Sequence, residues 1–123
     1  MNKLLSDITI YHKENNGWER YIVKASVRST VYLNRDDRGT GIQATDNALI
    51  RIFDVEGYNN TYKIKKGDVI YSGVSDYEID KAPLTELRNL YGKEKVFEVS
   101  SIEEFIFDDE DIKELNHIKV GGR

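Results

Sequence analysis

The sequence predicts a mainly β protein, a small β-barrel of about six or seven strands with one short α-helix. Short segments rich in β-branched and aromatic residues recur along the chain, and several alternate apolar with polar side chains. Turn-forming residues separate these segments, and a single stretch shows helical spacing. The 123 residues suffice for one modest core, so residues 1–123 are predicted to form a single β-barrel domain with a flexible loop at 34–47.

The first two predicted strands form a hairpin. Residues 7–11 alternate apolar and polar side chains, as a half-buried strand does. The polar segment 13–17 ends in an Asn-Gly pair, which favours a tight reversal of the chain. A second strand begins at Trp18. Its alternation continues past Arg28, so this strand is either long and bent or broken near Ser26.

A long polar loop follows, from Asn34 to Asn47. It contains two glycines and offers few apolar side chains to a core. A loop of this length in a small domain is more often functional or disordered than a plain connector. We therefore treat it as a candidate functional segment.

The middle of the chain is predicted to supply further strands. Residues 48–55 give the clearest alternation, and residues 56–60 are expected to turn. A short strand is expected at 62–64. Another is expected at 69–71, where a Gly-Asp turn leads into β-branched residues.

The one predicted helix lies between Pro83, which favours a helix start, and Gly92, which favours a stop. The apolar side chains between them recur at three- and four-residue spacing: Leu84, Leu87 and Leu90 or Tyr91. A helix of about two turns is not stable alone in water, so it must pack on the sheet.

The chain is predicted to end in a closing β-hairpin with an acidic tip. Residues 96–99 and 102–107 are strand-like, residues 108–111 are too charged to bury, and residues 117–120 alternate again. The apolar positions of the predicted strands are expected to form the core: Ile8, Ile10, Val23, Ile50, Ile52, Val69, Val99 and Val120. Leu84, Leu87 and Leu90 are expected on the buried face of the helix.

Nothing in the sequence calls for catalysis, so we predict that the protein is not an enzyme and has no cofactor or metal. His12 and His117 lack neighbouring ligands at metal-site spacing and are expected to be structural or surface residues. The acidic residues 108–111 with Glu114 lack the glycine and regular spacing of a calcium loop, which favours a solvated hairpin tip. The glycines at 39–41 are not followed by the Gly-Lys-Ser/Thr of a phosphate loop.

Charge and composition also narrow the range of partners. A net charge of −4 argues weakly against a dedicated nucleic-acid binder, and no apolar run is long enough for a membrane span. The eight tyrosines and one tryptophan could stack on bases or pack at cores and subunit contacts. The acidic balance favours packing and subunit contacts.

Three segments resemble a known family when they are taken in order. Residues 7–11 (DITIY), 66–73 (KGDVIYSG) and 116–123 (NHIKVGGR) are similar to segments of small minor capsid proteins from tailed phages and prophages of Gram-positive bacteria. These are the head-closure, or stopper, proteins of the head–tail connector. The chain departs from the family's pattern at residues 107–111, where an acidic run stands in place of an Asp-Asn-Arg-like turn.

The resemblance implies a structural β-barrel subunit of a homo-oligomeric ring in the virion neck, with about six or twelve copies. The ring would close the head and help to retain packaged DNA after assembly in the cytoplasm of the host bacterium. The implied partners are other copies of the chain, a portal-proximal connector protein, a tail terminator or tail protein, and the DNA that passes through the channel. No membrane is involved.

The resemblance also implies that the long loop can project into the channel and hold DNA. The matching residues are Asn34, Arg35, Asp36, Asp37, Arg38, Gly39, Thr40 and Gly41. The arginines could touch phosphate, while the aspartates would keep that contact weak enough to release. An ordinary surface loop is the alternative.

Two other functions remain open from the sequence. A tail terminator or tail-completion ring protein has a similar sequence pattern, so the sequence does not distinguish that function from head closure. A monomeric β-barrel module that binds nucleic acid or carbohydrate is a further alternative.

Overall fold

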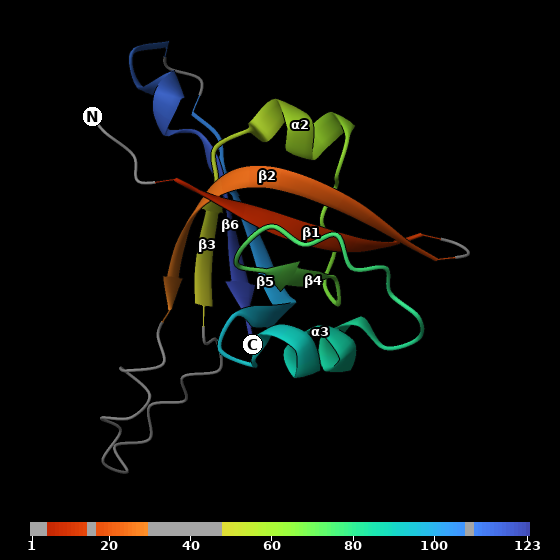
Figure 1. Cartoon of the computed structure of the whole chain (residues 1–123). Helices are drawn as coiled ribbons and strands as arrows, with labels where there is room; N and C mark the ends of the chain where they lie inside the picture. Colours follow the sequence, from red (N-terminus) through yellow and green to blue (C-terminus); the bar gives the residue numbers. More distant parts are fainter. Residues whose placement is uncertain (1–4, 15–16, 30–47, 108–109) are drawn as a thin grey trace.

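The strands of the computed structural model close into one antiparallel barrel over the described residues 5–14, 17–29, 48–107 and 110–123 (Figure 1). Their order around the barrel is β1-β2-β3-β6-β5-β4. The bounds of the strands are β1 Ser6–Glu14, β2 Gly17–Ser29, β3 Ala48–Ile52, β4 Val69–Tyr71, β5 Val96–Phe105 and β6 His117–Gly122. The prediction of a small β-barrel is thus confirmed, while the loop at 34–47 lies outside the described residues.

The first hairpin is the longest feature of the barrel. Its register runs from Ser6 opposite Ala25 to Glu14 opposite Gly17. The 13 residues of β2 form one strand, which confirms the long, bent alternative, and its curvature is plain in Figure 1. The strand changes partner at Ala25, which faces Ser6 on one side and Ile52 of β3 on the other.

The closing hairpin is also confirmed, because β5 and β6 pair antiparallel around a register shift between Val99 and Ser101. The last strand extends further than predicted, to Gly122. A Cβ on Gly122 would lie 2.7 Å from Cβ of Phe97, so this strand position fits only glycine without a shift. A 3₁₀ helix, η1, spans Glu110–Leu115 between the two strands.

The chain after β3 differs from the prediction. The strand stops at Ile52, and a short helix, α2, covers Val55–Asn60 where a turn was expected. The Asp54 side chain explains the change, because its Oδ1 accepts a hydrogen bond of 3.0 Å from the Gly57 N–H at the helix start. Residues 62–64 do not form a strand, although Tyr62 is buried.

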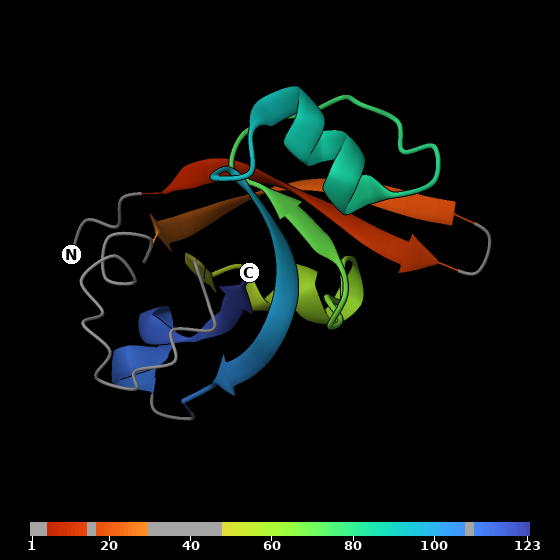
Figure 2. The same ribbon diagram turned by 90° about the horizontal axis from the view of Figure 1, so that it is seen from below.

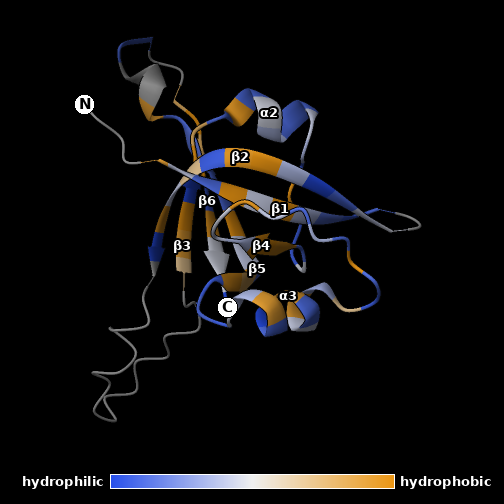
Figure 3. Cartoon of the chain, in the orientation of Figure 1, coloured by the Kyte–Doolittle hydropathy of each residue, from blue (hydrophilic) through white to orange (hydrophobic). Residues whose placement is uncertain are grey.

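Two apolar layers hold the structure together. The first fills the barrel and includes Ile8, Ile10, Ile50, Ile52, Val99, Ile118 and Val120. The second lies between the outer face of β1, β4 and β5 and the helix α3, Pro83–Tyr91, which crosses outside the barrel (Figure 2). Figure 3 shows α3 with both apolar and polar positions, as an amphipathic helix requires.

The predicted core is confirmed except at three positions, of which Leu84 is only partly buried against the second apolar layer. Val23 is only partly buried, because it lies in the part of β2 that pairs with β1 alone. Leu90 is 55% exposed. Tyr91 takes its place and stacks on Tyr71 with ring centroids 3.9 Å apart, while Leu87 is fully buried.

Candidate functional site

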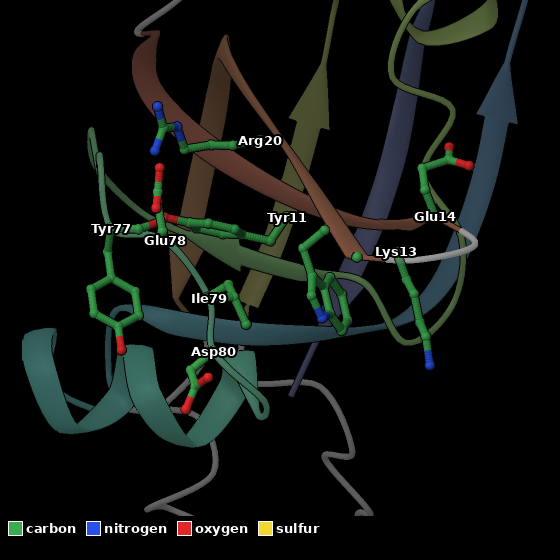
Figure 4. A pocket seen from close by; sticks show the side chains of 10 residues that line it. Tyr11, Lys13, Glu14, Arg20, Tyr77, Glu78, Ile79 and Asp80 are labelled. Carbon is green, nitrogen blue, oxygen red and sulfur yellow. The ribbon is translucent and has the colours of Figure 1, made fainter.

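A pocket of about 800 Å³ lies between the outer face of the β1–β2 hairpin and the segment 77–80 (Figure 4). The residues that line it are aromatic or charged for the most part: Tyr11, Lys13, Glu14, Gly17, Trp18, Arg20, Tyr77, Glu78, Ile79 and Asp80. These residues come from segments about 60 positions apart, so only the fold brings them together.

Strand register decides which hairpin residues face the pocket. Lys13 pairs with Trp18, and Tyr11 pairs with Arg20, so these four side chains share one face of the hairpin. Ile22, 49% exposed, continues that face one step further. In Figure 4 Arg20 and Glu78 point toward one another at one end of the pocket, while Lys13 extends at the other.

Tyr11 forms the floor of the pocket and connects the hairpin to the segment 77–80, which we call the far wall. Its ring is 1% exposed, and its hydroxyl lies 2.9 Å from both Ser75 Oγ and the Tyr77 carbonyl oxygen. Ser75 Oγ also lies 2.9 Å from the Tyr91 hydroxyl, and the Ser75 N–H donates to Thr9 Oγ1. Burial raises the pKa of the Tyr11 hydroxyl, so it remains a hydrogen-bond donor.

The Glu86 carboxylate holds the far wall in place. It accepts hydrogen bonds from the N–H groups of Asp80, Lys81 and Ala82 at 2.9, 2.7 and 2.6 Å. The Tyr77 hydroxyl donates to it at 2.8 Å. The three backbone donors, with Tyr77, lower the pKa of Glu86 to about 2.

Replacing Glu86 with glutamine is expected to lower Tm at neutral pH by several degrees. Because the folded-state pKa lies below the carboxyl group's usual pKa of 4.5, the carboxylate stabilises the fold above about pH 4.5 and loses that effect as the pH falls toward about 2. The Tm difference between wild type and Glu86→Gln should therefore shrink over that range. Melting curves across a pH series measure it, with the exposed Glu94→Gln as the control. A difference that does not change with pH would contradict the assignment.

His12 is a structural residue at the hairpin end of the barrel interior. It is 4% exposed, and its Nδ1 lies 2.6 Å from Oδ2 of Asp68, itself 2% exposed. The same carboxylate accepts from the N–H groups of Lys65 at 2.8 Å and Lys13 at 3.3 Å. His12 Nε2 lies 3.0 Å from Oε1 of Glu14, so all of its polar atoms are occupied.

The opposite end of the barrel carries a second exposed surface. Ser6 pairs with Ala25, Ala25 with Ile52, and Ile52 with Ile118, so these residues form one row across four strands. Ser6 is the end of β1 opposite to Glu14. The start of β6, η1 before it and the end of β5 therefore lie at the end of the barrel away from Glu14 and Gly17. The His117 ring stacks on that of Phe105 there, with ring centroids 4.9 Å apart, and lies tilted to the Phe53 ring at 5.6 Å. The exposed residues beyond this stack combine aliphatic, aromatic and acidic side chains: Ile106, Phe107, Glu110, Asp111 and Leu115.

We call these two surfaces the hairpin face and the tip face. The hairpin face consists of Lys13, Trp18, Arg20 and Ile22. The tip face consists of Ile106, Phe107, Glu110, Asp111 and Leu115. Figures 1 and 2 both place η1 far from the ends of β1 and β2 at Glu14 and Gly17.

The other residues singled out from the sequence are placed as follows. The DNA-channel candidates, residues 34–41, lie outside the described residues. Among residues that are described, no group of three or more acidic or histidine side chains is arranged to hold a metal ion. No helix within the described ranges could cross a membrane. Of the tyrosines in the segments predicted as strands, Tyr11 and Tyr62 are buried, which is the predicted packing role.

Comparison with known proteins gives a family without an assigned function. A model of the family of unknown function DUF6751 matches residues 4–123. No curated protein and no solved structure shows significant similarity to the chain. Because the match spans nearly the whole chain, the protein belongs to DUF6751.

Proposed function

We propose that this member of DUF6751 is a structural protein of the virion neck, which forms a ring between the portal-side connector and the tail and helps to retain packaged DNA. The resemblance of residues 7–11, 66–73 and 116–123 to head-closure proteins supports the proposal. The small β-barrel is the architecture that the resemblance implies.

The observation that carries the proposal is the presence of two unlike exposed faces at opposite ends of one barrel. A closed ring needs a heterologous contact, in which one patch meets a different patch on the next copy. The hairpin face offers two cations and an indole, whereas the tip face offers carboxylates and apolar side chains. A subunit with two such faces can join its neighbours in a ring and keep other surfaces for the proteins above and below.

Deleting the gene from a phage or prophage that carries it should yield heads that package DNA and then lose it, or that fail to join tails. Electron microscopy and nuclease sensitivity of the DNA in purified particles measure the two outcomes. Full, nuclease-resistant heads beside unjoined tails would place the protein at the tail-completion position. Normal yields of infectious, tailed particles would contradict a neck function, and wild-type protein supplied in trans is the control.

A monomeric binding module is the second candidate, and the pocket favours it. Trp18 and Tyr77 give the pocket aromatic surface, and charged side chains surround them. Aromatic rings beside polar groups can stack on sugars or bases. Binding of glycans or oligonucleotides to a monomer, lost in Trp18→Ala, would favour this function over the ring.

A further inference from the structure

Resting on the second candidate function, the binding module, we infer that the pocket between the hairpin and the far wall binds an uncharged oligosaccharide. Trp18 supplies the surface on which a sugar ring packs, and Lys13 and Asp80 bind its hydroxyl groups from opposite walls. The pocket volume of about 800 Å³ lies within the range of small-molecule sites, about 300–1,000 Å³. An oligonucleotide, the other ligand of that candidate function, fits the pocket less well.

The charges of the pocket favour a ligand without a net charge. Its charged lining residues are of both signs: Lys13, Arg20, Glu14, Glu78 and Asp80. Arg20 and Glu78 point toward one another in Figure 4, and Oε1 of Glu14 lies 3.0 Å from Nε2 of His12. An anion such as a phosphodiester is repelled by the three carboxylates, and a cation is repelled by the two basic side chains. A neutral ligand avoids both repulsions.

The free polar groups of the pocket suit hydroxyl groups. Within the described residues, the Lys13 ammonium and the Asp80 carboxylate form no hydrogen bond or ion pair. An ammonium only donates hydrogen bonds and a carboxylate only accepts them, whereas a hydroxyl does both. Lys13 lies on the hairpin and Asp80 on the far wall, so one ligand between them can use both groups. The hydroxyls of a sugar ring supply the acceptor and the donor that this pair requires.

Trp18 is the apolar platform of the pocket. It is half-buried, because it packs against the second apolar layer, and the rest of its side chain lines the pocket. Ile79 packs against the same layer from the far wall. The indole is therefore held in place before a ligand arrives. Its aromatic surface can cover the apolar C–H face of a sugar ring.

The two walls are also fixed in advance. The Glu86 carboxylate accepts hydrogen bonds from the N–H groups of residues 80–82 and from the Tyr77 hydroxyl. The Tyr11 hydroxyl ties the hairpin to the carbonyl oxygen of Tyr77. A preformed site loses less conformational entropy when a ligand binds.

The single tryptophan of the chain makes binding directly measurable. Titration of the full chain with maltotriose, cellotriose and chitotriose should change the Trp18 fluorescence to saturation with at least one of these neutral sugars. The affinity should be the same at low and high salt, because the ligand carries no charge. Trigalacturonic acid, which is anionic, and a single-stranded oligonucleotide should not bind.

Isothermal titration calorimetry on variants assigns the site. Trp18→Ala should weaken sugar binding on the order of tenfold or more, and Trp18→Phe, which keeps an aromatic ring, should lose less. Asp80→Ala alters an exposed side chain outside the apolar layers, so it tests the pocket without loss of folding, and it should weaken binding roughly severalfold. Lys63→Ala, at an exposed position outside the pocket, should bind as wild type does.

The outcomes separate the ligand from the function on which it rests. Sugar binding that is unchanged in Trp18→Ala and Asp80→Ala would overturn the pocket as the site. Oligonucleotide binding that is lost in Trp18→Ala, without any sugar binding, would overturn the ligand class and keep the binding module. No binding of any probe would overturn both. The neck function is decided separately, by the particles that lack the protein.

Discussion

Leu87→Asp is expected to unfold the protein or to detach α3 from the barrel. Leu87 is fully buried in the second apolar layer with Tyr11, Val69 and Val96. Losing a buried leucine costs about 2–5 kcal/mol, and burying an unpaired carboxylate adds to this cost. The sum approaches the whole free energy of unfolding of a typical domain, about 5–15 kcal/mol.

Thermal melts followed by circular dichroism measure this effect, and the same helix supplies the control. Leu90 is 55% exposed, so Leu90→Asp should change the free energy of unfolding by no more than about 0.5 kcal/mol. A Leu87→Asp protein that melts like wild type would contradict the packing of α3 on the barrel. Equal losses in the two variants would contradict the helix orientation.

The fold was largely predictable because local patterns and the barrel agree. Alternation of apolar and polar residues identified the strands. The pairs that form across them, such as Ile8 with Val23 and Ile50 with Val120, join apolar positions of that alternation. Proline and glycine at the two ends identified α3. These signals come from residues that are close together in the sequence, so they can be recognised from one sequence without knowledge of the fold.

The helix α2 was missed because its cause is mostly tertiary. It has six residues with a glycine inside and shows no helical period. It forms because Asp54 caps its start and because Tyr58, 3% exposed, packs against the core. The Tyr62 hydroxyl also lies 3.0 Å from Oδ2 of Asp54, which ties the chain after the helix to its cap. None of these contacts has a spacing that a sequence pattern reveals.

The candidate site was out of reach for the same reason. The pocket joins the hairpin to residues 77–80, and no pattern in the sequence indicates that these two segments meet. Lys13, Trp18 and Arg20 do share one face of the predicted hairpin. If the Asn-Gly pair is assumed to form a two-residue turn, the sequence alone places Lys13 opposite Trp18. That signal could have identified the hairpin face, although not the wall that faces it.

Asp68→Ala is expected to lower the free energy of unfolding by about 3 kcal/mol, because a hydrogen bond to a charged acceptor contributes about 1.5–3 kcal/mol and several donors share this one. Asp68 is 2% exposed and accepts hydrogen bonds from His12 and from the N–H groups of Lys13 and Lys65. Without the carboxylate the buried His12 donor and the two partly buried N–H groups lose their acceptor. Urea denaturation measures the loss, and Asp76→Ala, at an exposed position, is the control.

A double-mutant cycle separates the His12 contact from the two backbone contacts. His12→Ala removes one donor and leaves the Lys13 and Lys65 N–H groups bound to Asp68, so it should destabilise less than Asp68→Ala. The two substitutions together should cost less than the sum of the single losses, because both remove the bond of 2.6 Å. Equal stability of Asp68→Ala and Asp76→Ala would contradict the network.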